Sequence, residues 1–208
     1  MYNASVVPYK PKRDMAGPAI DSNNDIVPPL DYSFCRLTKP TDVYDETPRM
    51  NSPRKVKTQK AESGKSNSRC LRLNNNALTE IDSLIEVAST LFEKPSDIAW
   101  LDLSFNELTA INPAITELKN LQILYLHGNQ ISSLAEIEKL KSLTNLRKLT
   151  LHGNAVENEE NYRYYVLSIL PNLQELDFSC VTRNDRRTAE TWRKMGHAKK
   201  KKNKAVEN

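Results

Sequence analysis

Long apolar runs are missing from this chain of 208 residues. No stretch approaches the roughly 18 consecutive apolar residues that a membrane-spanning helix needs, so we expect no membrane partner. The N-terminal residues also lack the apolar core of a secretory signal, because Pro8, Lys10 and Pro11 fall within that stretch. The composition therefore favours a cytoplasmic protein.

Cysteine is also scarce. Cys35, Cys70 and Cys180 are odd in number and widely spaced. Neither a disulfide framework nor a zinc site has this pattern. We therefore expect reduced thiols, no bound metal and no cofactor.

Proline is rare after the first third of the chain, because eight of the 11 prolines lie before residue 68. Residues 1–67 carry 11 Lys and Arg against eight Asp and Glu, a net charge of +3. Residues 68–182 carry nine against 15, a net charge of −6, and residues 183–208 carry ten against three, a net charge of +7. These differences predict a long extended leader (1–67), a folded acidic domain (68–182) and a basic C-terminal segment (183–208).

The acidic domain contains a repeated motif, LxxLxLxxNxL. In the last, incomplete copy Phe178 takes an apolar inward position, and Val181 replaces the asparagine. The copies are SRCLRLNNNAL (68–78), IAWLDLSFNEL (98–108), LQILYLHGNQI (121–131), LRKLTLHGNAV (146–156) and LQELDFSCV (173–181).

The motif predicts a short strand followed by a turn. Its leucines at positions four and six alternate with outward residues, so both point inward from the strand. The asparagine turns the chain and satisfies backbone groups that the corner would otherwise bury without partners. One copy cannot bury its inner face alone. We therefore predict an α/β solenoid of about five repeats, with a parallel sheet on its concave side.

Helical segments are expected at the ends of this array. Residues 82–94 have the apolar spacing of a helix, which explains the greater length of the first repeat. A second helix ends before Pro171. Thr182 and Asp185 form a capping box ahead of a third helix over residues 183–195, with Ala189 and Trp192 as docking residues, which together predict a helical C-terminal cap.

The LHGN turns, the segment YRYYVLSILPNL and the segment DFSCVTRNDRRTAETWRKM resemble the capped intracellular leucine-rich-repeat proteins. That family includes a phosphatase-regulatory protein, the U2 snRNP A-prime protein and a light chain of axonemal outer-arm dynein. The resemblance covers roughly residues 28–195 and implies a leucine-rich repeat array. It also implies a non-catalytic scaffold within a large cytoskeletal assembly, with the microtubule-based axoneme of cilia and flagella as the first expectation.

A ribonucleoprotein scaffold, which binds a partner protein and RNA as U2 snRNP A-prime does, is the alternative, although nucleic acid is the less expected partner. An enzyme is not expected, because no nucleophile with a base, no paired acids and no cofactor loop can be placed on the repeats.

Motif positions three, five and seven should point outward from the concave sheet. Trp100, Ile123 and Tyr125 would then form an exposed apolar cluster typical of a protein interface. A covering loop or the leader could instead hide them. The predicted protein-binding residues on this face are Trp100, Asp102, Ile123, Tyr125, His127, Lys148 and His152.

His127 and His152 fall on neighbouring strands, about 4.8 Å apart, which is close enough for a metal or proton-transfer pair. No Cys or carboxylate occupies the same position on the flanking strands, where the residues are Ser104 and Ser179. The missing ligands argue against both functions.

The two extensions offer further binding residues. In the leader, PPLDYSF, with Leu30, Tyr32 and Phe34, is either a docking element or an N-terminal cap that folds over the first repeat. The basic tail is either a solvated segment or binds an acidic protein surface such as that of tubulin. Its lysines are Lys199, Lys200, Lys201, Lys202 and Lys204.

Overall fold

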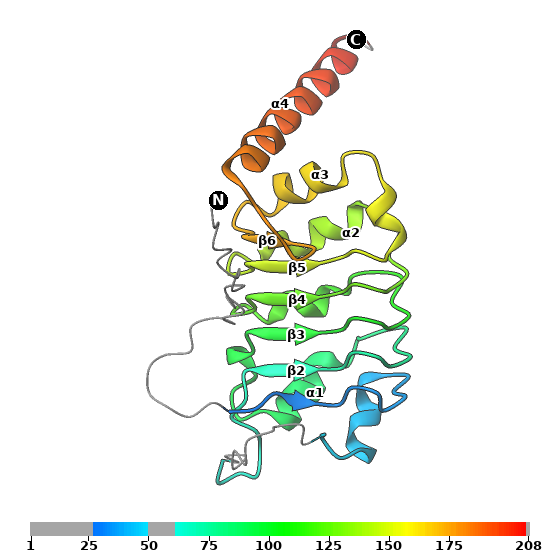
Figure 1. Ribbon diagram of the computed structural model, residues 1–208, viewed down its shortest axis with the longest axis vertical. Coiled ribbons are helices and arrows are strands. Elements are labelled where there is room, and N and C mark those ends of the chain that lie inside the picture. The colour runs from blue at the N-terminus through cyan, green and yellow to red at the C-terminus, as the bar shows by residue number, and fades with distance from the viewer. Residues whose placement is uncertain (1–26, 50–60, 207–208) are drawn as a thin grey trace, which may run out of the picture.

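The computed structural model describes residues 27–49 and 61–206 of the chain. These residues form a stack of coils, each of which contributes one short strand to a continuous sheet (Figure 1). The sheet order follows the chain order from β1 to β7, and neighbouring strands are parallel except for β6 and β7. The predicted solenoid with a parallel sheet is therefore confirmed.

The strands lie in a single register across the sheet. Leu71, Leu101, Leu124, Leu149 and Leu176 pair in succession and are fully buried. Each is the leucine at motif position four, so strand pairing stacks equivalent residues on one another. The parallel strands are β1 (Leu30–Asp31), β2 (Cys70–Arg72), β3 (Trp100–Asp102), β4 (Ile123–Tyr125), β5 (Lys148–Thr150) and β6 (Glu175–Leu176).

The motif asparagines tie consecutive coils together. Asn106 Nδ2 donates to the carbonyl oxygens of Leu73 and Leu103, at 3.0 Å each, and its Oδ1 accepts from the backbone N–H of Leu78 at 3.1 Å. The asparagines of the next two coils repeat this pattern. Because buried backbone groups without partners are costly, these asparagine side chains stabilise the turns by satisfying them.

The connecting segments form the other wall of the stack, and α1 and α2 lie behind the strands in Figure 1. The helix predicted over residues 82–94 is confirmed as α1 (Leu84–Leu91), and the helix before Pro171 is confirmed as α3 (Tyr162–Ile169). The other short helices of this wall are α2 (Ala135–Glu138) and the 3-10 helices Pro95–Asp97, Pro113–Glu117, Lys139–Ser142 and Ala155–Asn158.

An N-terminal cap precedes the first predicted repeat. β1 pairs with β2, and Tyr32, Leu37 and Val43 are buried in the common core. The prediction of an extended leader over residues 1–67 is therefore wrong for residues 27–49, because their apolar side chains pack against the first repeat. The remaining leader residues up to 60 lie outside the described part of the chain.

This cap is a further copy of the repeat that the sequence reading missed. LDYSF at 30–34 aligns with LDLSF at 101–105, with Cys35 in place of the asparagine. In both copies the aspartate Oδ1 accepts from the N–H of the serine two residues later, at 2.8 Å and 3.1 Å. The match between these two pentapeptides is the sequence signal that identifies the copy.

The last copy of the motif ends in a hairpin. Asp177 and Phe178 both have positive φ, 52° and 58°, so the chain reverses and β7 (Ser179–Cys180) runs antiparallel to β6. A two-residue turn with positive φ at both positions matches the twist of the strands it joins. The prediction that Phe178 points inward is therefore wrong, because its side chain is 56% exposed.

The C-terminal cap is the helix α4 (Arg183–Val206), which extends beyond the predicted range 183–195 and points away from the array (Figure 1). Its first turns pack on α3. Ala189 is buried, and the ring of Trp192 meets that of Tyr165 edge-on at 5.8 Å. Both predicted docking residues are confirmed.

The predicted capping box is also present at the start of α4. Thr182 Oγ1 accepts from the N–H of Asp185 at 3.1 Å, and Asp185 Oδ2 accepts from the N–H of Thr182 at 2.9 Å. The Arg163 guanidinium donates to the same carboxylate at 3.1 Å. These hydrogen bonds, Arg163 first, lower the pKa of Asp185 to about 2.

Candidate protein-binding surface

The outward residues of the strands form the concave face. Ile123 and Asp102 are buried, with 4% and 5% exposure, so the predicted exposed trio is wrong at Ile123. Ile123 pairs in register with Trp100 and Lys148, so it lies between two neighbouring strands. The other five predicted residues of this face are half-buried and present part of their surface: Trp100, Tyr125, His127, Lys148 and His152.

Six rings from four consecutive coils meet on this face, and we call them the aromatic cluster. Tyr125 contacts three of the other rings, with ring centroids 5.9 Å from Trp100, 5.9 Å from His127 and 5.6 Å from Phe178. Edge-to-face pairs at such distances are favourable by about 0.5–1.5 kcal/mol each. The cluster comprises Trp100, Phe105, Tyr125, His127, His152 and Phe178.

The two histidines stack face to face, with centroids 4.7 Å apart and planes 9° from parallel. His127 Nδ1 lies 2.8 Å from Thr150 Oγ1, and His152 Nδ1 lies 3.4 Å from Asp177 Oδ1. Burial, followed by the nearby His152, lowers the pKa of His127. In the part of the chain that the structure describes, no three His, Cys, Asp or Glu side chains gather as a metal site. The stacked imidazoles form part of the packed surface of the concave face.

Phe105 and Phe178 are the cluster residues that sequence reasoning missed. Both have positive φ, 53° and 58°, and they are 53% and 56% exposed. The left-handed conformation costs an ordinary residue about 1 kcal/mol or more, and burial of these rings does not offset that cost. Gly128 and Gly153 occupy the position of Phe105 in the next two repeats, also with positive φ. A phenylalanine at a turn position that other repeats fill with glycine is therefore the sequence signal for Phe105.

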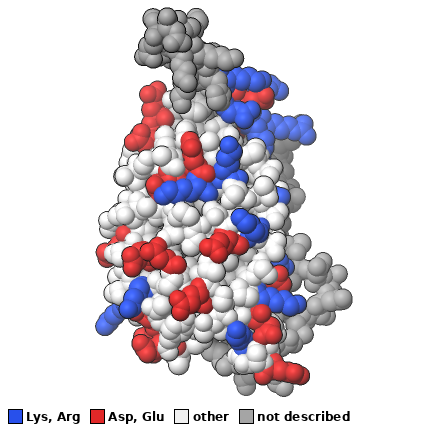
Figure 2. All heavy atoms as spheres, turned by 180° about the vertical axis from the view of Figure 1, so that it is seen from behind, with Lys and Arg blue, Asp and Glu red and all other residues white. Residues whose placement is uncertain are grey.

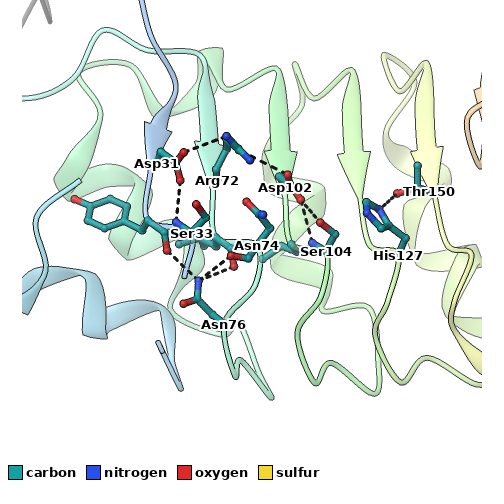
Figure 3. A network of polar contacts seen from close by, with 12 residues as sticks. Asp31, Ser33, Arg72, Asn74, Asn76, Asp102, Ser104, His127 and Thr150 are labelled. Carbon is teal, nitrogen blue, oxygen red and sulfur yellow. Dashed lines mark hydrogen bonds and ion pairs between the residues drawn. The ribbon is translucent and has the colours of Figure 1, made fainter. Parts of the chain in front are cut away.

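The N-terminal half of the concave face is polar (Figure 3). Arg72 Nη1 donates to Asp31 Oδ2 at 3.1 Å, and Arg72 Nε lies 3.8 Å from Asp102 Oδ2. Both carboxylates are largely buried, and burial raises the pKa of Asp102. The charges of this half therefore pair with one another across β1, β2 and β3.

The predicted docking residues of the leader fall into different environments. Tyr32 belongs to the core and Leu30 is partly buried against it, so the cap alternative applies to both. Phe34 is 62% exposed, and the guanidinium carbon of Arg49 lies 5.5 Å from its ring centroid. The lysines of the predicted basic tail lie in the last part of α4, and their side chains lie outside what the structure describes.

Charged side chains are spread over the face of the molecule that is turned away from the viewer in Figure 1 (Figure 2). Acidic and basic groups are interspersed there, and several basic ones lie together near the end that carries the C-terminus (Figure 2). The aromatic cluster is distinct because its own side chains include no carboxylate, Lys or Arg.

In the described ranges 27–49 and 61–206, no helix has the length and apolar character needed to cross a membrane.

Stacked strand-and-turn coils, asparagine ladders and caps at both ends define a leucine-rich-repeat protein. A family model described as "Leucine-rich repeat" matches residues 92–207. Leucine-rich repeat-containing protein 51 of Bos taurus is 49% identical over 174 residues, which cover 84% of this chain and 89% of that protein. The Mus musculus protein of the same name is 50% identical with the same coverage. The chain thus belongs to the leucine-rich-repeat family and, within it, to the family of leucine-rich repeat-containing protein 51.

A solved structure, a complex of Drosophila melanogaster SNF and U2A′, has the same fold. It aligns with 74% of this chain and 92% of its own matched chain, with a TM-score of 0.57 and 23% sequence identity. Leucine-rich-repeat proteins are in general non-catalytic scaffolds for protein interaction, and the names of these relatives mention no enzymatic activity.

Proposed function

We propose that this protein is an adaptor that holds a partner protein against the aromatic cluster and so joins it to a larger assembly. The observation that carries the proposal is the exposure of Phe105 and Phe178 beside partly exposed Tyr125 and Trp100. Aromatic side chains gathered in a patch are typical of the energetic centre of a protein interface.

The size of the surface sets a requirement on the partner. A stable interface buries about 800 Å² on each side, and the six parallel strands span only about 24 Å across the stack. Phe105 and Phe178 extend the surface beyond the strands, because both lie on turns. The partner therefore contacts these turns as well as the strand residues.

The assembly we propose is the axoneme of cilia and flagella. The resemblance to capped repeat proteins of axonemal dynein supports this choice. The acidic repeat domain with its basic C-terminal segment also suits a protein that bridges surfaces of opposite charge, such as a basic partner and acidic tubulin.

The experiment is retention in demembranated axonemes. We expect the double variant Trp100→Ala/Tyr125→Ala to be extracted at lower salt than wild type, although it stays folded. The matched control is Tyr44→Ala, which removes a ring that is 45% exposed and lies outside the aromatic cluster. Equal retention of wild type and a folded double variant would exclude the concave face as the binding surface.

The ribonucleoprotein alternative predicts a different outcome. Under it, a tagged protein is found in the nucleus and associates with RNA in a salt-sensitive manner. The likeness to the SNF/U2A′ structure is one of fold, and within the described residues we find no feature that favours RNA over protein as the ligand of the concave face.

A further inference from the structure

Two phenylalanines occupy equivalent positions in different copies of the repeat. Phe34 follows LDYS in the N-terminal cap, and Phe105 follows LDLS in the third coil, counting the cap as the first. Their backbones are alike, with φ of 59° and 53°, and both rings are more than half exposed. The same local structure is therefore present twice, at the edge of the sheet and within it.

At the edge of the sheet, the Phe34 ring already contacts a cation, the guanidinium of Arg49. The backbone N–H of Arg49 donates to the carbonyl oxygen of Asp31 at 2.7 Å, which aligns this residue with the free edge of β1. Arg49 Nη1 donates to the carbonyl oxygen of Ser33 at 3.2 Å, and its guanidinium carbon lies 5.5 Å from the Phe34 ring. A guanidinium over an aromatic face is held by the negative potential of that face.

The inner copy offers a comparable ring on a platform. Phe105 lies against the backbone of Gly128, since a Cβ built on that glycine would fall 2.6 Å from Phe105 Cδ1. His127 meets Phe105 edge-on at 5.0 Å and Phe178 at 5.7 Å, so the two exposed phenylalanines border one imidazole. Among the described residues, Arg49 over Phe34 is the one guanidinium–ring contact, so no arginine of the described chain occupies the Phe105 ring.

The surrounding charge favours a cation over an anion. The repeat domain carries a net charge of −6, and the lowered pKa of His127 keeps that imidazole neutral near pH 7. Within the domain, Lys148 is already paired with Glu175 at 2.9 Å, and Arg72 is paired with Asp31. A basic side chain of the partner therefore meets the faces of aromatic rings in an acidic domain. The nearby Lys148 and Arg72 are already paired and do not compete with it.

We propose that the aromatic cluster binds arginine side chains of its partner, with the Phe105 and Phe178 rings as the receiving faces. The Arg49–Phe34 contact is the intramolecular counterpart of this interaction. The inference rests on the proposed function and specifies the partner chemistry: a protein segment that presents arginine and apolar residues together.

The test uses the immobilised full chain and a displayed library of random helical peptides. Binders whose affinity falls with Trp100→Ala/Tyr125→Ala report on the concave face. We expect those binders to be enriched in arginine. Replacing the key arginine by citrulline, a neutral isostere, should weaken binding roughly fivefold or more, because the shape is kept and the charge is lost.

A double-mutant cycle then locates the arginine. In the variant Phe105→Leu/Phe178→Leu, which keeps apolar side chains but removes the π faces, citrulline should change the affinity by less than about twofold. If the leucine variant does not fold, Phe105→Gly/Phe178→Gly replaces it, because glycine adopts positive φ freely. Folding is checked by circular dichroism and urea midpoints.

The outcomes separate this inference from the proposed function. Concave-face binders without arginine, or a citrulline penalty that is the same in the wild type and the leucine variant, would overturn the arginine proposal alone. A library that yields no binder sensitive to the Trp100/Tyr125 variant would overturn both.

Discussion

The two halves of the concave face use their polar and aromatic groups in opposite ways. Across β1, β2 and β3, Arg72 lies between Asp31 and Asp102, and these charges are neutralised within the fold. From Trp100 on β3 through β4 and β5 to the hairpin, the rings are partly or largely exposed, and two of them, Phe105 and Phe178, occupy a backbone conformation that costs stability. The first half therefore stabilises the array, whereas the second half is available for binding.

The largest expected effect tests the first half. Arg72→Met keeps most of the side-chain volume but leaves two largely buried carboxylates without their cation. We expect a loss of about 3 kcal/mol in the free energy of unfolding, measured by urea denaturation. Partner binding by the folded fraction should be unchanged. A variant that keeps its stability but loses binding would reverse the roles of the two halves.

A medium effect is expected at the turn that supports Phe105. Gly128→Ala adds a Cβ that meets the Phe105 ring and strains a residue with φ of 67°. We expect a loss of about 2 kcal/mol by urea denaturation and weaker partner binding, because the ring is displaced. The matched control is Gly64→Ala, where φ is 80° and nothing lies within 4 Å of the added Cβ. It should lose only the conformational part, about 1 kcal/mol. Equal losses at the two glycines would show that Phe105 does not rest on Gly128.

The smallest expected effect is a difference in pH dependence between the halves. The pKa of His127 is lowered by burial and by His152, so below about pH 6.5 the unfolded chain takes up a proton first and stability falls. The pKa of Asp102 is raised by burial, so at lower pH, as the folded carboxyl takes up its proton first, this group adds stability.

His127→Gln should therefore flatten the decline in urea midpoint between about pH 7 and pH 5. Asp102→Asn should leave that decline in place. A decline that persists unchanged in the His127 variant would assign it to another group.

The sequence predicts the repeated part of this protein well, because leucines and asparagines with structural roles recur at regular positions in each repeat. The parallel strands, the asparagine turns, α1, α3 and the capping box of α4 all follow from residue type and spacing. Lys148 and His152 also lie on the concave face as their motif positions predict.

The exceptions occur where the motif degenerates. Cys35 stands at the asparagine position of the N-terminal cap, so the motif does not identify that copy. The sequence therefore leaves open whether Tyr32 docks a partner or caps the array, and the structure buries it in the cap. Asp177 and Phe178 reverse the chain, which no leucine spacing encodes. Ile123 is buried although its motif position points outward, because a motif position gives the direction of a side chain and not its exposure.

Site-specific photo-crosslinking in ciliated cells tests the central claim most directly. Phe178→p-benzoylphenylalanine places the crosslinker on the aromatic cluster, and the same substitution at Tyr44 places it on an exposed residue outside the cluster. We predict a discrete crosslinked partner from position 178 and none from position 44. Crosslinking from position 44 without crosslinking from position 178 would contradict the account.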